Sequence, residues 1–383
     1  MSVYILSSSR TPQGAFNGNL SSVKSTALGS IAIKGALEKL KDQKVDEVIM
    51  GQVIQAGVGQ APARQAALGA DLPNSTPCVT VNKVCGSGMQ AIIDGAKSIL
   101  CDDAKLIVAG GMESMSQAPH FTHLRGGTKF GTNEIKDSLM MDGLWDVYSN
   151  RLMGSCAEEC AGKYNFTRQE QDDFAISSFK KAQAAQEAGV FKNEITPVLV
   201  KNRKSETLIE NDESPFNANF EKIPKLRAAF DKEGTITAAN ASSMNDGAAA
   251  VVLASSEYKD QAKFEILSWA RHAQDPTWFT TAPVEAMKKN LEKQSLSIND
   301  IDLFEINEAF AVVTMAAIKE LDIPEEKVNI YGSGISLGHP LGVSGARILI
   351  TLMNGLEQKN KTLGMASLCI GGGEALSMII KRL

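Results

Sequence analysis

The feature that most constrains the fold is the alternation of short apolar runs with helix-period patterns in the first ~115 residues. Residues 3–6 and 47–54 are short and apolar, as buried strands are, whereas residues 25–40 repeat apolar side chains at helical spacing. A second helical pattern covers residues 85–100, and a strand-like run follows at 105–109. Strands that alternate with helices predict an α/β fold built of stacked layers.

The same alternation returns after about residue 237, beyond a stretch of different texture. Residues 110–240 are richer in polar residues, proline and glycine, and they hold one charged helix pattern at 167–187, with Thr167 as its N-cap and Glu170 three residues later. We therefore expect an inserted subdomain between two α/β parts. The second part is expected to contain helices at 284–294, 308–321 and 341–356 and strands at 301–306, 362–370 and 375–381.

Length and charge limit the class of protein. The 383 residues suffice for two or three domain-sized units, and the net charge of −5 does not favour a nucleic-acid partner, which would require a basic face. The sequence shows no secretory or transit pattern, and no apolar run reaches the ~18 residues of a membrane span. We therefore expect a cytoplasmic protein without membrane or nucleic-acid partners.

The six cysteines indicate free thiols rather than a disulfide framework, because the chain is long and shows no secretory signal. Cys156 and Cys160 have no second cysteine pair nearby and only four histidines are available, so we expect no metal site. The glycine clusters lack both the P-loop spacing and the dinucleotide-binding spacing, which disfavours a nucleotide-dependent kinase or dehydrogenase.

Cys85 stands where a strand pattern meets a helix pattern, directly before Gly86, Ser87 and Gly88. The glycines allow a tight turn and a close approach of a ligand to the backbone. Free N–H groups at the helix start, together with the helix dipole, would lower the pKa of the thiol and favour the nucleophilic thiolate. The alternative is a small buried apolar residue, which is the usual fate of a free cysteine.

Three further residues could complete a site with Cys85. His339 lies in a glycine-flanked turn before a proline, where a neutral imidazole could take the thiol proton; a turn histidine without a role is the alternative. Cys369 ends an apolar strand before three glycines, whose N–H groups could bind an oxyanion, or it is a buried cysteine beside a structural turn. Asn307 joins a strand to a helix, and taken alone it is best explained as a helix cap.

Taken together and in this order, these motifs resemble the thiolase family. The resemblance rests on residues 81–88 (VNKVCGSG), 307–311 (NEAFA), 338–342 (GHPLG) and 369–373 (CIGGG), and residues 110–116 (GGMESMS), 153–158 (MGSCAE) and 240–249 (NASSMNDGAA) add to it. It covers essentially the whole chain. It implies a homotetramer and two similar core halves in alternating α/β/α/β/α layers with an inserted loop domain. The implied boundaries are 1–115 plus 241–262 for the N-terminal core half, 116–240 for the loop domain and 263–383 for the C-terminal core half.

Within the family, residues 125–127, 142–144 and 153–156 are most similar to the acetoacetyl-CoA thiolases. The implied reaction is a reversible Claisen condensation of two acetyl-CoA to acetoacetyl-CoA plus CoA, through an acetyl-Cys85 intermediate. Such a reaction belongs to fatty-acid, mevalonate or ketone metabolism, and it needs no cofactor besides the CoA thioester substrates.

The resemblance also implies the roles of individual residues. His339 would help Cys85 to ionise, and Cys369 would supply or remove the second proton. The expected donors to the enolate oxygen are the His339 ring and a water held by Asn307. The acyl-enzyme oxygen would meet the backbone N–H groups of Cys85 and Gly371.

The implied substrate-binding residues are Met153, Phe230, Ala238, Ser242, Ala309, Phe310, Lys225 and Arg227. Lys222, Lys225 and Arg227 could meet the CoA phosphates or form a solvated basic face. Two positions depart from the family pattern. Leu152 replaces a histidine that is usual in short-chain members, which leaves the acyl-chain preference open. Residues 212–217 (DESPFN) correspond to a loop that usually supplies an arginine against the adenine, and here Phe216 could stack on the adenine instead.

Three rival functions remain at this point. One is a degradative 3-oxoacyl-CoA thiolase of broader chain length. Another is a decarboxylating ketosynthase-type enzyme, which lacks a second catalytic cysteine, so Cys369 argues against it. The last is a non-catalytic acyl-CoA-binding protein on the same fold.

Overall fold

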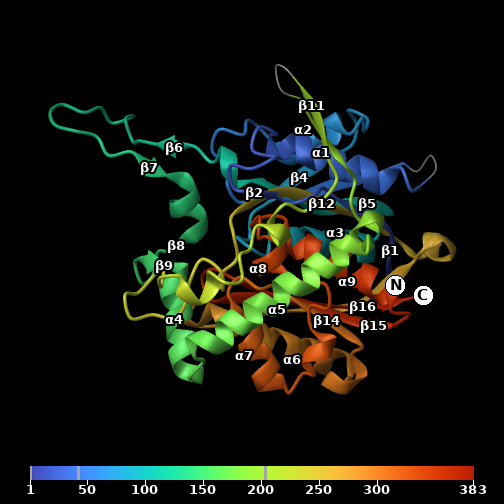
Figure 1. The fold of residues 1–383 in the computed structure, drawn as a ribbon. Helices are drawn as coiled ribbons and strands as arrows, with labels where there is room; N and C mark the ends of the chain where they lie inside the picture. Colours follow the sequence, from blue (N-terminus) through green and yellow to red (C-terminus); the bar gives the residue numbers. More distant parts are fainter. Residues whose placement is uncertain (1, 41–43, 202–204) are drawn as a thin grey trace.

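A mixed sheet organises the computed structural model, which describes residues 2–40, 44–201 and 205–383 (Figure 1). Within these ranges ten strands follow the order β14-β15-β16-β13-β1-β12-β5-β3-β4, with β2 paired to β12. The strands are β1 (Val3–Arg10), β2 (Gly14–Ala15), β3 (Glu47–Gly51), β4 (Cys78–Val81), β5 (Leu106–Ser114), β12 (Asn245–Ala254), β13 (Phe264–Ala273), β14 (Leu303–Ile306), β15 (Leu363–Ile370) and β16 (Glu374–Arg382).

The sheet has the same order on both sides of the junction between β1 and β13, where residues 3–5 pair with 264–266. Moving outward from the junction, the strands are β1, β12, β5 and β3 on one side and β13, β16, β15 and β14 on the other. On both sides the two inner pairs are antiparallel and the outer pair is parallel. The prediction of two similar α/β halves is therefore confirmed.

Helices cover both halves in layers, as Figure 1 shows. They are α1 (Ser25–Leu37), α2 (Pro62–Gly69), α3 (Ser87–Leu100), α6 (Ala282–Gln294), α7 (Ala311–Leu321), α8 (Gly334–Leu337) and α9 (Ser344–Gln358). Successive strand residues point to opposite faces, so one strand serves two cores: Val251 and Leu253 of β12 pack in the cluster of α3 and α9, whereas Val252 and Ala254 pack in that of α1 and α2. Helices α6 and α7 cover the outer face of the second half. The predicted α/β/α/β/α layering is thus confirmed.

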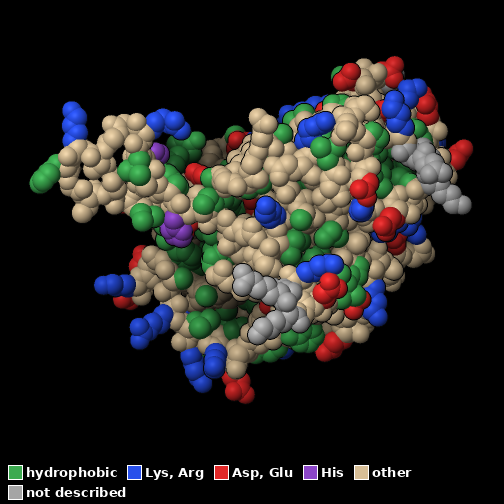
Figure 2. Space-filling view, turned by 90° about the horizontal axis from the view of Figure 1, so that it is seen from above, with side chains coloured by type: hydrophobic (Ala, Val, Ile, Leu, Met, Phe, Trp, Pro, Cys, Tyr) green, Lys and Arg blue, Asp and Glu red, His purple; other side chains and the backbone are tan. Residues whose placement is uncertain are grey.

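The inserted segment lies over one side of this core. It contains β6 (His120–Phe121), β7 (Lys136–Asp137), β8 (Trp145–Asp146), β9 (Arg151–Leu152), α4 (Met153–Tyr164), α5 (Arg168–Glu187), β10 (Val198–Lys201) and β11 (Glu206–Ile209). The arm between β6 and β7 projects from the body, with hydrophobic side chains near its tip (Figures 1 and 2). Strand β12 returns the chain to the first half of the sheet. The exact domain boundaries stay a prediction.

The capping box predicted at the start of α5 is present, with Thr167 and Glu170 bonded to each other's backbone N–H groups. Several other helices begin later than their patterns indicate. Helix α3 begins at Ser87, α7 at Ala311 and α9 at Ser344, two to three residues after the predicted starts, because turns precede α3 and α9, and a bend and an isolated bridge precede α7. Helix α1 ends at Leu37 rather than at residue 40. In the described part of the chain, no helix has the length and apolar character needed to cross a membrane.

Candidate active site

One apolar cavity, of about 470 Å³, brings together residues from distant parts of the chain. Cys85, His339 and Cys369, the three residues predicted to carry the chemistry, all line it. Cys85 precedes α3, His339 precedes α9 and Cys369 lies near the end of β15. The first lies in the N-terminal half and the other two lie in the C-terminal half, so the site forms at the joint between the halves.

Cys85 is held by a strained turn. Val84, directly before it, has a φ of +46°, a conformation that is costly for a β-branched residue. Hydrogen bonds fix this turn: the Val84 N–H donates to Asn82 Oδ1 at 3.0 Å, and Ser87 Oγ donates to the Val84 carbonyl at 2.7 Å. The turn exposes the Cys85 sulfur to the cavity at the mouth of α3.

Helix α3 and strand β5 approach the loop that carries His339 so closely that both need a glycine at the contact. A Cβ on Gly88 would lie 2.9 Å from the Ala346 nitrogen and 3.0 Å from the Gly342 oxygen, closer than real Cβ contacts. A Cβ on Gly111 would collide with the same Gly342 carbonyl. The glycines of the sequence motifs therefore allow the His339 loop to pack against the start of α3.

The predicted lowering of the Cys85 pKa is wrong for this state of the protein. Burial raises the pKa of the Cys85 thiol to about 11, and the backbone N–H groups of Gly371 and of Cys85 itself oppose the shift only in part. The helix start acts in the expected direction, but desolvation of the thiolate is the larger effect. Cys85 therefore rests as a neutral thiol and needs a base.

His339 is the base that the cavity offers. Burial and, to a lesser degree, the neighbouring Arg347 guanidinium lower the pKa of the ring to about 3, so the imidazole is neutral at physiological pH. Its Nδ1 atom lies 2.5 Å from Ser344 Oγ and 3.3 Å from Asn307 Nδ2. Its Nε2 atom is buried and has no hydrogen-bond partner among the residues that the structure describes. The ring is thus anchored at Nδ1, which leaves Nε2 for the thiol or a ligand.

Cys369 is the second thiol of the cavity. It is buried, and desolvation together with the nearby Cys85 raises its pKa well above the ordinary value. The glycine loop that follows turns sharply: Gly373 has a φ of +85°, and a Cβ there would collide with the Gln274 carbonyl. This turn brings Gly371 to the cavity wall, where its N–H faces the Cys85 sulfur.

Asn307 lies behind His339 and does not line the cavity. The helix-cap interpretation is wrong, because the N-cap of α7 is Phe310 and no side chain caps it. The Asn307 oxygen instead lies 3.4 Å from Nη2 of Arg347, a fully buried guanidinium that also donates to Ser333 Oγ at 3.0 Å. A water held by Asn307 stays a prediction.

Most of the predicted substrate-binding residues line the cavity wall, and that group is Met153, Phe230, Ala238, Ser242, Ala309 and Phe310. The rings of Phe230 and Phe279 each meet the Phe310 ring edge to face, at centroid distances of 6.0 and 6.2 Å. Phe279 was missed, because nothing in its local sequence distinguishes it from an ordinary core phenylalanine. Leu152, the departure from the family pattern, also lines the cavity.

The predicted contacts to the CoA phosphates lie outside this wall. Lys222, Lys225 and Arg227 are exposed, directly before, at the end of and just after a short 3-10 helix (Ile223–Lys225). Phe216 is also exposed and away from the cavity lining. Ala229, two residues after Arg227, does line the cavity, whereas the three basic residues are not part of its lining.

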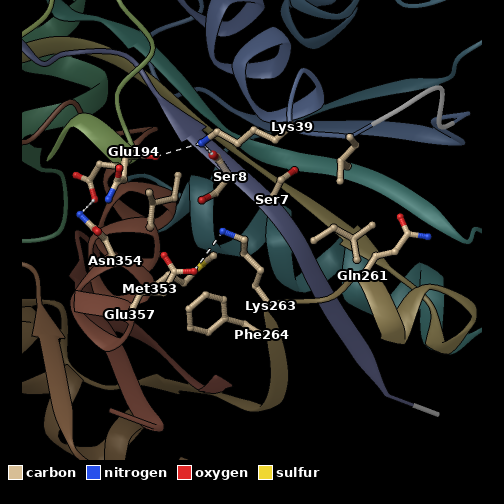
Figure 3. Close-up of a pocket in the computed structure, with 14 residues that line it drawn as sticks. Ser7, Ser8, Lys39, Glu194, Gln261, Lys263, Phe264, Met353, Asn354 and Glu357 are labelled. Atoms are coloured by element: carbon tan, nitrogen blue, oxygen red, sulfur yellow. Dashed lines mark hydrogen bonds and ion pairs between the residues drawn. The ribbon is translucent and has the colours of Figure 1, made fainter. Parts of the chain in front are cut away.

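A second hollow, of about 500 Å³, lies between β1, β13 and α9 (Figure 3) and has a different chemistry. Its lysines already contact other groups of the protein: Lys39 Nζ donates to the Ser8 carbonyl at 2.6 Å, and Lys263 Nζ pairs with Glu357 at 3.4 Å. No cysteine or histidine is among its lining residues. It therefore lacks the groups for acyl transfer that the first cavity has.

Comparisons with known proteins agree with this site. The chain is 49% identical over 389 residues to an acetyl-CoA acetyltransferase of Schizosaccharomyces pombe, an alignment that covers 99% of this chain and 98% of the relative. It is 48% identical to a mitochondrial acetyl-CoA acetyltransferase of Rattus norvegicus, with 100% and 91% covered.

Solved structures show the same likeness. The Acat5 thiolase from Ascaris suum in complex with coenzyme A superposes with a TM-score of 0.95 at 43% identity, covering 100% of both chains. The Bacillus anthracis acetyl-CoA acetyltransferase superposes with a TM-score of 0.97 at 38% identity, covering 100% of this chain and 99% of the other. The model of the thiolase N-terminal domain matches residues 3–257, and that of the C-terminal domain matches residues 260–382. With two thiols and a neutral histidine meeting in one cavity at the joint of two similar halves, the chain belongs to the thiolase family.

Proposed function

We propose that the protein is an acetyl-CoA C-acetyltransferase, which condenses two acetyl-CoA to acetoacetyl-CoA plus CoA and catalyses the reverse reaction. The observation that carries the proposal is the meeting of Cys85, His339 and Cys369 on the wall of one apolar cavity. Relatives that align with the whole chain carry the name acetyl-CoA acetyltransferase.

In the first half-reaction, the Cys85 thiol gives its proton to His339 Nε2, and the sulfur attacks the thioester carbonyl of acetyl-CoA. The C–S bond to CoA breaks, and the leaving thiolate takes the proton of Cys369. The backbone N–H groups of Cys85 and Gly371, which face the Cys85 sulfur, would donate to the oxygen of the acyl group carried there. Each such donor is typically worth about 3 kcal/mol in the transition state.

In the second half-reaction, the Cys369 thiolate removes a proton from the methyl carbon of a second acetyl-CoA. The enolate oxygen meets the Nε2–H of His339, an atom that no other described residue hydrogen-bonds. The enolate carbon attacks the acetyl group on Cys85, and acetoacetyl-CoA leaves. The Cys85 thiolate then recovers its proton from His339, and the second proton remains on Cys369.

The cavity wall sets the acyl-chain preference. Phe230, Phe279 and Phe310 close its apolar side, and Leu152 stands at the entrance to α4. Bulky rings near the reacting sulfur favour a short acyl group over a long one. A degradative 3-oxoacyl-CoA thiolase uses the same catalytic residues, so chain length is the property that separates the two functions.

The direct test of the chemistry is the covalent intermediate. Incubation with acetyl-CoA, followed by acid quenching and peptide mass mapping, is expected to find one acetyl group on the peptide that contains Cys85. Labelling of another cysteine, or binding of CoA without any acetylation, would contradict the proposal. The second outcome would indicate an acyl-CoA-binding protein.

Three further parts of the proposal concern the whole protein. We propose a homotetramer, a cytoplasmic location, and a reaction that requires only the CoA thioesters as substrates, with no separate cofactor. One relative is named as mitochondrial, so cell fractionation is the test of location. Activity that survives dialysis against a chelator is the expected result for a reaction without a metal.

A further inference from the structure

The Nδ1 atom of His339 has two side-chain neighbours with opposite hydrogen-bonding abilities. Ser344 Oγ lies 2.5 Å from it, and Asn307 Nδ2 lies 3.3 Å from it. A hydroxyl can either donate or accept a hydrogen bond, whereas an amide N–H can only donate. Ser344 is the first residue of α9 and is fully buried. The mechanism above gives it no role.

Arg347 fixes the orientation of the Asn307 amide. Its Nη2 atom lies 3.4 Å from Asn307 Oδ1, and a guanidinium has donors only, so the amide oxygen must face it. The NH₂ group of Asn307 is therefore directed toward His339 Nδ1. An N–H aimed at Nδ1 favours the tautomer in which Nδ1 is bare and Nε2 carries the proton. That tautomer can donate a hydrogen bond to a substrate oxygen, but it cannot accept the thiol proton at Nε2.

Ser344 supports the opposite tautomer. Its Oγ lies 3.0 Å from the Pro340 carbonyl, which can only accept, so the hydroxyl proton has a place to go. The lone pairs of the hydroxyl then face Nδ1, and they can accept an Nδ1–H at 2.5 Å. With the proton on Nδ1, the Nε2 atom is bare. Within residues 2–40, 44–201 and 205–383 that atom has no hydrogen-bond partner, and His339 lines the cavity with Cys85.

We propose that Ser344 is a positioning residue that makes the basic tautomer of His339 available to Cys85. Of the two neighbours of Nδ1, it is the one that can accept a proton from the ring. The inference rests on the proposed function for the role of Cys85 as nucleophile. The need for a base is independent of the substrate, because burial keeps the Cys85 thiol neutral.

The proton movements balance. The Cys85 proton moves to Nε2, the ring becomes an imidazolium, and Nδ1–H remains bonded to Ser344 Oγ. Burial and, to a lesser degree, the Arg347 guanidinium lower the pKa of this ring, so the imidazolium readily returns its proton once the Cys85 sulfur is free to take it. When iodoacetamide is the electrophile, the sulfur–carbon bond forms, iodide leaves, and the ring proton passes to solvent.

The test compares Ser344→Ala with Ser30→Ala. Ser30 is a matched control, since it is also a buried helix serine whose hydroxyl donates to the carbonyl four residues earlier, at 2.9 Å. At neutral pH, Ser344→Ala should slow the alkylation of Cys85 by iodoacetamide at least about tenfold, which is less than the ~10²–10⁴-fold cost of losing a whole general base because the variant keeps His339 itself. The kcat for acetoacetyl-CoA cleavage should fall by a similar factor with a smaller change in KM. Ser344→Thr, which keeps the hydroxyl, should restore much of both rates.

Equal alkylation rates in folded Ser344→Ala and Ser30→Ala, with equal melting temperatures, would overturn the proposal. A second measurement needs no variant at residue 344. Nitrogen-15 spectra of the wild type, in a chain with four histidines, should show a His339 population protonated at Nδ1. A ring found entirely in the Nε2–H form would contradict the proposal. Iodoacetamide contains no thioester, so a protein that is inactive on acetoacetyl-CoA but keeps this dependence on Ser344 would refute the proposed function and leave the inference standing.

Discussion

At the residue scale, the neutrality of Cys85 and His339 governs the chemistry. Both groups are buried in an apolar cavity, which raises the pKa of the thiol to about 11 and lowers the pKa of the imidazole to about 3. A preformed thiolate–imidazolium pair would pay the desolvation of two charges. The nucleophile is therefore formed only as the thioester is attacked, and the resting thiol is protected from oxidants and stray electrophiles.

The pH dependence of Cys85 reactivity follows from this neutrality. Because the thiol pKa is raised, the thiolate fraction is small at pH 7 and increases about tenfold for each pH unit until the pKa near 11 is reached. In the wild type, transfer of the thiol proton to neutral His339 adds a route whose rate does not change with pH in this range. In Ser344→Ala, where this assistance is weakened, the alkylation rate by iodoacetamide, followed by peptide mapping between pH 6 and 10, should rise throughout the range. A plateau that begins below pH 8 in this variant would show a low-pKa thiolate instead.

The reactive residues could be predicted because each lies in a short local motif beside glycines. The supporting residues could not. Arg347 reaches Asn307 only through the packing of α9 against the end of β14, which no local pattern encodes, and Ser344, five residues after His339, carries no sequence signal that marks it as a partner of the ring. The predicted direction of the Cys85 pKa shift was wrong for a similar reason, because the burial of the thiol depends on the assembled cavity.

At the scale of elements, the site depends on how closely β5 and α3 approach the loop before α9. Gly111 of β5 lies against the Gly342 carbonyl. Glu113, at the end of the same strand, accepts hydrogen bonds from the N–H groups of Val53 at 2.9 Å, Ile54 at 3.2 Å and Gly342 at 2.9 Å. One buried carboxyl thus joins the end of β3 to the loop that carries His339.

Gly111→Ala should disturb this contact. The added Cβ would collide with main chain that cannot move without shifting the His339 loop. Overpacking of this kind typically costs about 1–3 kcal/mol of folding free energy, so we expect a lower melting temperature and a lower kcat. The control is Gly126→Ala, where no atom lies within 4 Å of the new Cβ. Thermal unfolding and kcat that match between the two variants would contradict the close approach.

Glu113 should also give the fold a pH dependence. Burial raises its pKa to about 7 from 4.5, so the folded state favours the protonated carboxyl. Its contribution to stability is complete below pH 4.5 and is lost as the pH rises through about 7. Between pH 5 and 8, the melting temperature of the wild type should fall relative to that of Glu113→Gln, which does not titrate. Parallel curves for the two proteins would show that Glu113 is not the group responsible.

The spacing of apolar residues predicted which segments are helices and which are strands. It predicted the first and last residues of these elements less well. The segments before α3, α7 and α9 carry apolar residues in helical spacing although they are not helical. In these segments, Cys85, Phe310 and Leu341 face the cavity rather than a helix interface. A functional cavity and a helix face both need apolar side chains, and period alone does not separate them.

At the scale of the whole molecule, two similar halves join through one sheet, and the reactive residues of both meet at the joint. The arm between β6 and β7 has no role in that core. It presents Phe130, which is 100% exposed, with Leu124 and Ile135 also exposed. Exposed apolar side chains on a projecting segment are typical of a contact with another chain, which agrees with the homotetramer that we propose.

The mass in solution tests this assembly. Light scattering should give about four times the chain mass of 41.0 kDa. Phe130→Asp together with Ile135→Asp should lower the mass, because charges in an apolar interface are costly. Leu383→Asp, at a half-exposed position on the C-terminal residue, is the control. A monomeric wild type, or a double variant of unchanged mass, would contradict the role of the arm.

The layered fold with its two similar halves could be predicted because the strand–helix alternation returns after the inserted segment and the motifs follow one another in a fixed order along the whole chain. The continuous pairing of β1 with β13 could not, since it depends on contacts between residues more than 250 positions apart. The same applies to the exposed location of Lys225 and Arg227, whose relation to the cavity depends on the path of the inserted segment.

Cleavage of 3-oxoacyl-CoA thioesters decides whether this protein is a short-chain thiolase with Cys85 as its nucleophile. The experiment measures CoA-dependent cleavage of substrates of increasing chain length, in the wild type and in Cys85→Ser. We expect the wild type to cleave acetoacetyl-CoA in preference to longer substrates and Cys85→Ser to lose nearly all turnover. Preferred cleavage of long chains would assign the protein to the degradative thiolases. Unchanged turnover in Cys85→Ser would contradict the account of the site itself.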